Sequence, residues 1–295
     1  MQTGTPAALV SRMVRSGDFR AAWFEAWRPW FRSVSANGIP LGGDFLHRKE
    51  WEFIAIAEAF RECGMLQSGR RGIGFAVGRE PLPALFAGAG CEIVATDRAD
   101  DARNAWPGDW PADRQALAHP EICPAPVFEK QVVFERVDMR HIPARLGGFD
   151  FAWSCCAAEH LGSLQAGLDF LWAAIDCLRP GGVVAHTIEY NVSSNQRTIF
   201  SGPTVLFRRK DIEAFRAAVD AAGHEMAAPD FAEGNALEDR FLAQPPFEDR
   251  RHNLAHLRLQ IGRYVATSML VVVRRGERLR DNHSSHHQPT ALPMK

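Results

Sequence analysis

The sequence predicts an α/β fold in which a doubly wound, mostly parallel sheet is covered by helices on both faces. The first observation is a turn between a short apolar run and a helical pattern, which contains Gly72, Gly74 and Gly78. The other two are acidic residues that end the next two apolar runs, Asp97 and Asp138. Because the carboxyl ends of parallel strands meet at one edge of a sheet, these features are expected to line one ligand site.

The composition is that of a globular protein with a sizeable core. Of 295 residues, 46% are hydrophobic and 23% are charged, which is ordinary for a soluble domain. The net charge of −1 gives no field that would attract nucleic acid or an anionic membrane, so neither partner is expected. The six cysteines lack CxxC spacing. We therefore expect reduced thiols in a cytoplasmic protein, with no disulfide and no structural zinc.

Residues 1–66 are predicted to form an N-terminal helical extension that caps the fold. Aromatic and aliphatic residues recur at helical spacing between about residues 18 and 66. A loop rich in glycine and proline interrupts them at residues 37–44. Charged residues also interrupt the first apolar residues of the chain, so no export signal is expected.

The main domain is predicted at residues 67–275. A strand, a helix and a second strand form one βαβ unit at residues 73–77, 81–89 and 92–96. Residues 98–130 contain several prolines and no clear period, so they are predicted to be an insertion.

The second half of the domain continues the alternation of strands and helices. Large aliphatic residues step by four and three positions from Leu164 to Leu178, which predicts a helix that covers the sheet. A turn at residues 178–182 leads into the next strand. The remaining predicted elements are strands at 132–137, 149–154 and 183–187, a helix at 210–222 and an antiparallel last strand at 265–274. Residues 276–295 lack periodicity and are predicted to be disordered.

The glycine turn and Asp97 carry the cofactor hypothesis. A glycine turn lets the backbone approach a ligand, and the helix that follows offers free N–H groups to an anion. A carboxylate at the position of Asp97 can accept hydrogen bonds from both hydroxyls of a ribose. The alternatives are a tight turn without a ligand and an N-cap role for Asp97.

The stretch from Gly72 to Gly182 and the string His186 to Asn191 resemble the class I S-adenosylmethionine-dependent methyltransferases. The likeness is greatest to a bacterial methyltransferase-domain group of the type 11-like kind. Strings similar to HRKEWE, GFAVGREPLPALFA, CAAEHLGS and TVLFRRKDIE occur in that group. The resemblance covers about residues 46–275. It implies a Rossmann-like, seven-stranded sheet and S-adenosyl-L-methionine as the cofactor.

The first motif of that family is an acidic residue followed by GxGxG, and this chain departs from it. Alignment places Gly74 where the acidic residue normally stands, Ala76 and Gly78 at the first two glycines, and Glu80 at the third. Glu80 is the candidate to replace the missing carboxylate that faces the ammonium group of the cofactor. The alternative is that Glu80 is only an acid in the first turn of a helix.

The resemblance also implies adenine contacts at the third strand. Asp138 matches the position whose carboxylate takes the adenine amino group, and Met139 matches the apolar residue that packs on the ring. The alternative for Asp138 is an ordinary turn begun by aspartate. Cys156, after the fourth strand, is a further expected cofactor contact. A cysteine nucleophile of the cytosine-methylating kind is not expected, because the proline that precedes it in those enzymes is absent.

The candidate catalytic residues lie beyond the fourth and fifth strands. Glu159 and His160 match positions that lie between cofactor and acceptor in the family. A neutral imidazole can remove a proton from a hydroxyl acceptor near neutral pH, which makes His160 the first candidate for a base. His186 and Glu189 are the second candidates. The alternative is that these histidines are structural.

The function expected from these residues is methyl transfer to an oxygen or nitrogen of a small-molecule or glycan-type acceptor. Two alternatives remain. A nicotinamide-dependent oxidoreductase would use the same turn, although no complete GxGxxG is present. A catalytically silent protein that binds S-adenosylmethionine would explain the altered first motif. No metal ligand set is predicted, and the oligomeric state is not indicated. Trp51, Trp106 and Trp110 would either stack on the acceptor or fill the core.

Overall fold

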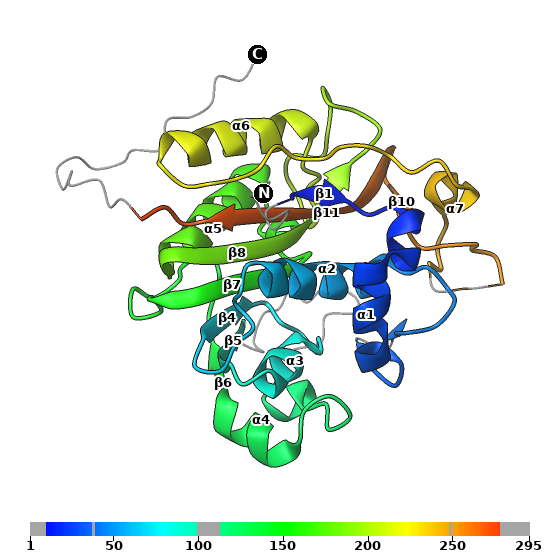
Figure 1. Cartoon of the computed structure of the whole chain (residues 1–295). Helices are drawn as coiled ribbons and strands as arrows, with labels where there is room; N and C mark the ends of the chain where they lie inside the picture. The colour runs from blue at the N-terminus through cyan, green and yellow to red at the C-terminus, as the bar shows by residue number, and fades with distance from the viewer. Residues whose placement is uncertain (1–9, 37–38, 99–112, 248, 250, 278–295) are drawn as a thin grey trace, which may run out of the picture.

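The computed structural model describes residues 10–36, 39–98, 113–247, 249 and 251–277. Within these residues a nine-stranded sheet has the order β6-β5-β4-β7-β8-β11-β10-β9, with β1 on the edge of β11 (Figure 1). Its strands are β1 (Arg12–Met13), β4 (Arg71–Phe75), β5 (Glu92–Asp97), β6 (Val132–Arg136), β7 (Phe149–Cys155), β8 (Leu178–Asn191), β9 (Leu242–Ala243), β10 (Arg258–Ile261) and β11 (Tyr264–Arg274). A separate hairpin joins β2 (Ser35–Ala36) and β3 (Ile39–Pro40).

The sheet confirms the predicted fold class. Strands β6, β5, β4, β7 and β8 are parallel, and β11 runs antiparallel to both β8 and β10. The two-residue strands β1 and β9 bring the described sheet to nine strands where seven were predicted. Such short edge strands have too few residues to leave a periodic pattern in the sequence.

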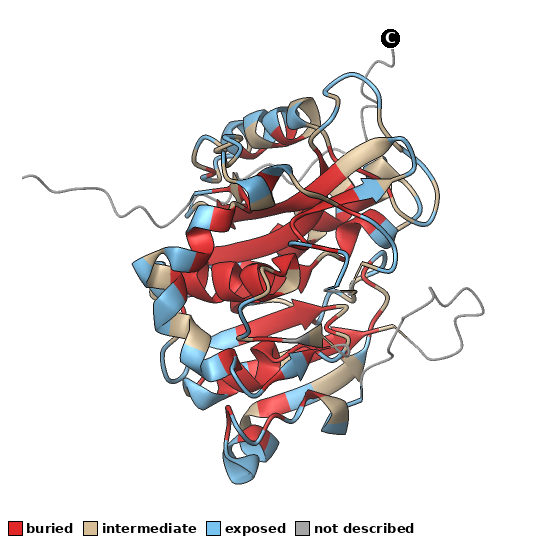
Figure 2. Cartoon of the chain, turned by 90° about the vertical axis from the view of Figure 1, so that its right-hand side faces the viewer, coloured by how far each residue is buried: buried red, intermediate tan, exposed pale blue. Residues whose placement is uncertain are grey.

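Helices cover both faces of the sheet. The α-helices are α1 (Ala22–Phe31), α2 (Arg48–Glu62), α3 (Leu82–Gly88), α4 (Ala125–Gln131), α5 (Leu164–Asp176), α6 (Arg209–Ala221) and α7 (Leu237–Arg240), and the 3-10 turns are η1 (Ser16–Arg20), η2 (Gln115–Leu117) and η3 (Ala158–His160). One hydrophobic core cluster lies between one face of the sheet and helices α1, α2, α3 and α4. The other lies between the opposite face and helices α5 and α6. Figure 2 shows the buried strands in red between helices whose outer sides are pale blue.

Alternation along β7 explains how one strand supplies both clusters. Phe151 and Trp153 face α2 and α3, while Ala152 between them faces α5. All seven residues of β7 are buried. A strand that is covered on both faces is mostly apolar; in β7 the exceptions are Ser154 and Asp150, which pairs with Arg70 and Arg179.

The N-terminal segment packs on the sheet through α2 and adds strand β1 to it. Helix α2 packs on β7, β8 and β11, and β1 pairs with β11 through Arg12 and Leu270. Twelve of the fifteen residues of α2 are buried, including Trp51, whose indole donates to Asp18 at 2.9 Å. The sequence allowed two roles for Trp51, stacking on the acceptor or filling the core, and Trp51 fills the core. The boundary between 1–66 and 67–275 stays a prediction.

Two segments differ from the sequence-based expectation. The predicted insertion at 98–130 contains α4, which packs on α3 and β6 and leads into β6. Pro124 and Pro126 stand at the start of this helix, where proline is tolerated; Trp106 and Trp110 lie outside the described residues. Strand β8 runs from Leu178 to Asn191, far longer than the predicted 183–187, so it includes the predicted turn at 178–182. None of the described helices is sufficiently long and apolar to span a bilayer.

Candidate active site

The turn between β4 and α3 has the backbone shape that the glycine motif predicted. Ala76 and Gly78 have φ angles of 50° and 52°, in the left-handed region that a residue with a side chain enters only at a cost. The amide of Gly78 donates to Asp97 Oδ2 at 3.1 Å, and the amide of Val77 donates to the carbonyl of Thr96. The turn is therefore tied to the carboxyl end of β5.

Asp97 is held at this edge of the sheet. Its side chain is 8% exposed, and its Oδ1 accepts a hydrogen bond of 2.8 Å from the amide of Arg98. These bonds fix the carboxylate beside the turn that follows β4. Whether Asp97 also contacts a ribose stays a prediction, and its position suits that role.

Glu80 points into the protein. Its Oε1 accepts a hydrogen bond of 2.5 Å from the indole of Trp153 on β7, and the residue is 3% exposed. Burial raises the pKa of Glu80 to about 8, so the carboxyl is mostly protonated at neutral pH. Gly74 lies opposite Trp153 in the parallel pairing, and a Cβ atom there would stand 2.4 Å from the indole. Trp153 therefore lies against both altered positions of the first motif, Gly74 and Glu80. The sequence did not reveal these contacts.

Asp138 and Met139 lie just beyond the end of β6. The carboxylate of Asp138 accepts hydrogen bonds from Arg140 at 2.7 to 3.1 Å on an exposed loop. These bonds lower the pKa of Asp138 to about 2. Met139 is 8% exposed and belongs to the core cluster beneath α5. Adenine contacts by these two residues stay a prediction.

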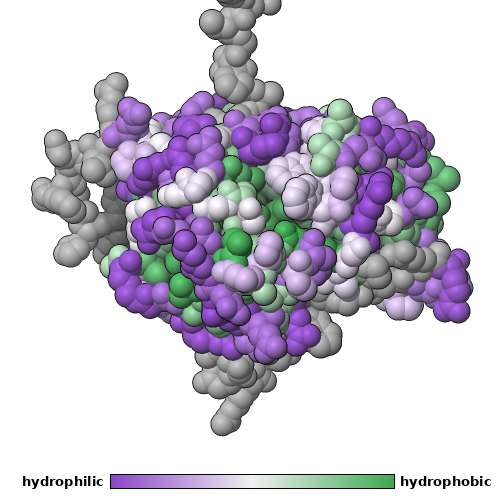
Figure 3. All heavy atoms as spheres, turned by 60° about the horizontal axis from the view of Figure 1, so that its bottom comes forward, coloured by the Kyte–Doolittle hydropathy of each residue, from purple (hydrophilic) through white to green (hydrophobic). Residues whose placement is uncertain are grey.

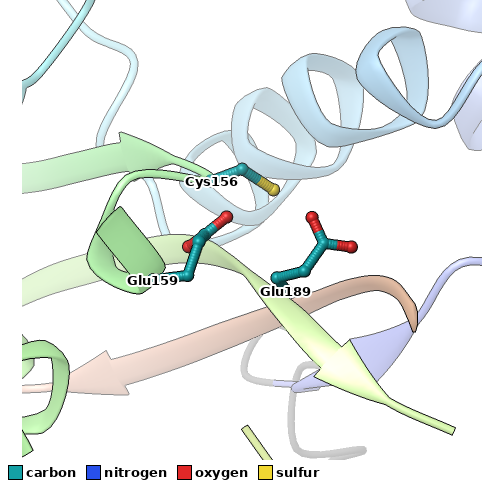
Figure 4. A group of neighbouring side chains, drawn as sticks. All are labelled: Cys156, Glu159 and Glu189. Atoms are coloured by element: carbon teal, nitrogen blue, oxygen red, sulfur yellow. The ribbon is translucent and has the colours of Figure 1, made fainter. Parts of the chain in front are cut away.

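Three side chains converge at the ends of β7 and within β8. Single ligand atoms of Cys156, Glu159 and Glu189 all lie within 4.8 Å of one another. Figure 4 shows the three side chains together. Cys156 has a φ of 50° and is held by its amide, which donates to the carbonyl and hydroxyl of Thr187. Glu159 follows in η3 and is fully buried. Among the residues that the structure describes, neither of its carboxyl oxygens has a hydrogen-bond partner.

Helix α2 brings charged side chains to the same cluster. Arg48 donates to Glu189 at 2.8 Å and to Ser268 at 3.1 Å, and Ser268 is the cross-strand partner of Glu189. The adjacent Lys49 pairs at 2.8 Å with Glu52, which lies about one helical turn further along α2, and donates to the carbonyl of Cys155. Two cations and three carboxylates therefore share a largely buried region, which we call the polar cluster (Arg48, Lys49, Glu52, Cys156, Glu159 and Glu189).

Burial controls the ionisation of this polar cluster. Burial alone would lower the pKa values of Arg48 and Lys49, but the neighbouring carboxylates raise both above their ordinary range. Lys49 and Arg48 overcome the effect of burial on Glu52 and lower its pKa. Glu159 lacks such a partner, so burial raises its pKa to about 7, with Glu189 adding to the shift and His160 opposing it. Glu159 thus changes charge near neutral pH.

The two predicted histidines occupy different environments. His160 is exposed, and its Nδ1 lies 2.9 Å from the carbonyl of Pro203. Since a carbonyl only accepts, this bond places a proton on Nδ1. His186 is fully buried in the core, next to Phe170, with Nδ1 2.8 Å from Ser154 Oγ. Burial lowers the pKa of His186 to about 3, so it is neutral and lies apart from the polar cluster.

Sequence reasoning named Cys156, Glu159 and Glu189 but missed the three charged residues of α2. The string HRKEWE contains them, and it was noted only as a point of resemblance. Its signal is the run of charged positions at the start of a helix whose middle, Phe53 to Ala57, is apolar. Charged side chains on a buried helix need partners in the same protein.

An apolar groove of about 390 Å³ lies elsewhere, between α1, the end of α2 and α3. Its lining includes Trp27, Trp30, Leu66, Leu85 and Ile122. Figure 3, in which the bottom of Figure 1 comes forward, shows hydrophobic residues at the surface between hydrophilic ones. None of the lining residues belongs to the polar cluster.

No protein-family model matches the sequence, and no curated protein matches it. Similar solved structures include phosphoethanolamine N-methyltransferase 2 from Haemonchus contortus, with 14% identity and a TM-score of 0.46 over 86% of this chain and 57% of that chain. Another is an S-adenosylmethionine-dependent methyltransferase from Clostridium acetobutylicum, with 12% identity and a TM-score of 0.42 over 79% and 93%. At these values neither protein informs the activity of this chain.

The strand order decides the fold. Five parallel strands in the order β6-β5-β4-β7-β8 meet an antiparallel β11, which lies between β8 and β10. The fold is that of the class I methyltransferases. The narrower type 11-like group stays a prediction.

Several residues of this methyltransferase fold suit S-adenosylmethionine. The turn at Ala76 and Gly78 and the buried carboxylate of Asp97 stand together at the strand ends, where adenosine ligands bind in doubly wound sheets. The positions expected to face the amino-acid half of the cofactor differ from the family's usual first motif. Position 74 has no room for an acidic side chain, and Glu80 is bonded to Trp153.

Proposed function

We propose that this protein is an S-adenosylmethionine-dependent methyltransferase that acts on an oxygen or nitrogen of a small-molecule or glycan-type acceptor. The observation that carries the proposal is the polar cluster just after β7 and in the last part of β8, in the same sheet whose strand β5 ends at Asp97. An orphaned carboxyl buried in such a place costs free energy in the absence of a ligand. Such a cost is typical of residues retained for a function.

Each group of residues has one part in this proposal. Asp97 and the turn at Ala76 and Gly78 would hold the ribose, and Asp138 and Met139 would hold the adenine. When bound, the cofactor supplies a methyl group on a positively charged sulfur. Glu159 and Glu189 lie on the acceptor side, where alignment of the two reactants contributes most of the rate.

The alternatives raised by the sequence remain distinct outcomes. Calorimetric titration with S-adenosylmethionine, S-adenosylhomocysteine and NAD tests all three. Binding of both adenosyl compounds without NAD binding is expected, followed by transfer of a labelled methyl group to members of an acceptor panel. Tight adenosyl binding without transfer would favour a silent binding protein, and binding of NAD alone would favour an oxidoreductase.

A further inference from the structure

The polar cluster has an uncompensated carboxylate. Arg48 and Lys49 carry two positive charges, and Glu52, Glu159 and Glu189 carry three negative charges when all are ionised. The two cations are already engaged, because Arg48 bonds Glu189 and Lys49 bonds Glu52. Glu159 is therefore the member left over: it is fully buried, its carboxyl oxygens have no hydrogen-bond partner on another described residue, and the neighbouring His160 only partly opposes the effect of burial on its pKa. One further positive charge would complete the cluster.

The geometry favours a compact group that both carries this positive charge and donates hydrogen bonds. Atoms of Glu159, Glu189 and Cys156 lie within 4.8 Å of one another, close enough for a single group to contact both carboxylates. An ammonium group carries three N–H donors on one atom and matches this arrangement. The cluster also borders the surface, since Cys156 is partly exposed and 21% of the Lys49 side chain is accessible.

A divalent metal fits the same atoms less well. Arg48 occupies Glu189 at 2.8 Å, and a metal ion would have to displace this guanidinium or share its carboxylate. Cys156 binds metal as a thiolate, and burial raises its pKa well above the ordinary value. Two resident cations on α2 add repulsion.

We propose that Glu159, with Glu189, binds the protonated amine of the methyl acceptor, so that the acceptor atom is nitrogen and Glu159 takes its proton. This inference rests on the proposed function and narrows it from oxygen or nitrogen to an amine. The ammonium gives one proton to the Glu159 carboxylate and becomes a neutral amine. Its nitrogen lone pair then forms a bond to the methyl carbon while the carbon–sulfur bond breaks and sulfur keeps the electron pair. The product is a protonated methylamine, and Glu159 returns its proton to solvent.

The experiment uses the full chain saturated with S-adenosylhomocysteine. Matched probes are titrated by calorimetry: 2-aminoethanol against ethane-1,2-diol, glycine against glycolate, and glucosamine against glucose. At least one amine is expected to bind tenfold or more tightly than its hydroxyl partner. Glu159→Gln is expected to abolish that preference and leave S-adenosylhomocysteine affinity unchanged. Asp169→Asn, an exposed carboxylate of α5 that is bonded to Gln165, is the matched control and should retain the preference.

A second measurement needs no variant. Because the free Glu159 carboxyl is largely protonated at pH 6, an ammonium that binds its carboxylate must displace a proton there. Heats measured in buffers of different ionisation enthalpy should show proton release at pH 6 that disappears at pH 8. If Glu159→Gln does not fold, this measurement of proton release by the wild-type chain still tests the inference.

The outcomes separate the two proposals. No binding of S-adenosylhomocysteine by the wild-type chain would overturn the proposed function and this inference with it. Intact binding of that compound with equal affinity for amines and alcohols, or with an amine preference that survives Glu159→Gln, would overturn the inference alone. If zinc chloride binds through Glu159 and blocks amine binding, the cluster is a metal site and the amine inference is overturned.

Discussion

The indole of Trp153 donates a hydrogen bond of 2.5 Å to Glu80 and fills the space that a side chain at Gly74 would need. Trp153 lies on β7, and Gly74 is its partner on β4. One aromatic side chain thus accounts for two departures from the usual first motif, the missing acidic residue and the glutamate in the place of the third glycine. Packing between neighbouring strands accounts for Gly74, and a hydrogen bond to β7 accounts for Glu80.

Substitution of Gly74 by alanine is expected to destabilise the protein by about 1–3 kcal/mol, the usual cost of overpacking a core. The added Cβ would lie 2.4 Å from the Trp153 ring and 2.7 Å from Val77. Urea unfolding measures the change. Gly147→Ala is the control, since the nearest atom there is 3.8 Å away; a loss as large as that of Gly74→Ala would show that the indole is not the cause.

Glu80→Gln is expected to remove a pH dependence of stability. The pKa of Glu80 is about 8 in the folded protein against an ordinary 4.5. Between these values the folded state holds a proton that the unfolded chain releases, so stability falls as pH rises. The slope from this one group is at most about 1.4 kcal/mol per pH unit. Between pH 5 and 9 the unfolding free energy of the wild type should fall relative to that of Glu80→Gln as pH rises, and parallel curves would contradict the assignment.

Asp97→Asn is expected to weaken S-adenosylhomocysteine binding by about 10- to 100-fold. This range corresponds to the loss of one hydrogen bond to a charged group, about 1.5–3 kcal/mol. Calorimetry provides the dissociation constant, and circular dichroism checks that the fold is retained. Asp169→Asn should leave the affinity unchanged. Equal affinities for wild type and Asp97→Asn would remove the ribose role.

Arg48→Met is expected to cost about 3–5 kcal/mol of stability, because it leaves the buried Glu189 carboxylate without its cation. Glu189→Gln in the same chain should restore part of that loss. A double-mutant cycle from urea unfolding measures the coupling between the two side chains. Additive effects would mean that the pair contributes little.

Most of the sheet could be predicted because its strands are buried on both faces. Strand β7, with every residue buried, leaves a short, mostly apolar run between turn residues. Helix α5 leaves a regular spacing of aliphatic residues, because only one of its faces is buried. Helix α4 begins among prolines, and β8 continues through Gly181 and Gly182. Both were missed because these residues are typical of loops.

The candidate site was only partly predictable for a different reason. Glu159 follows β7 and Glu189 lies near the end of β8, and both strands could be located in the sequence, so the place of these residues was foreseeable. Arg48 bonds Glu189 from 141 positions away in the chain. No local pattern reports which face of a buried helix meets a distant strand. The same applies to Trp153 and Glu80, which are 73 positions apart.

The contact of the first helices with β11 has a consequence during synthesis. Ser268, on the last strand, hydrogen-bonds both Arg48 and Glu52 near the start of the chain. While the ribosome still holds β11, these two ionised groups have no buried partner there and must stay hydrated. The amino-terminal helices can therefore reach their final position only once β11 has been made and has joined the sheet.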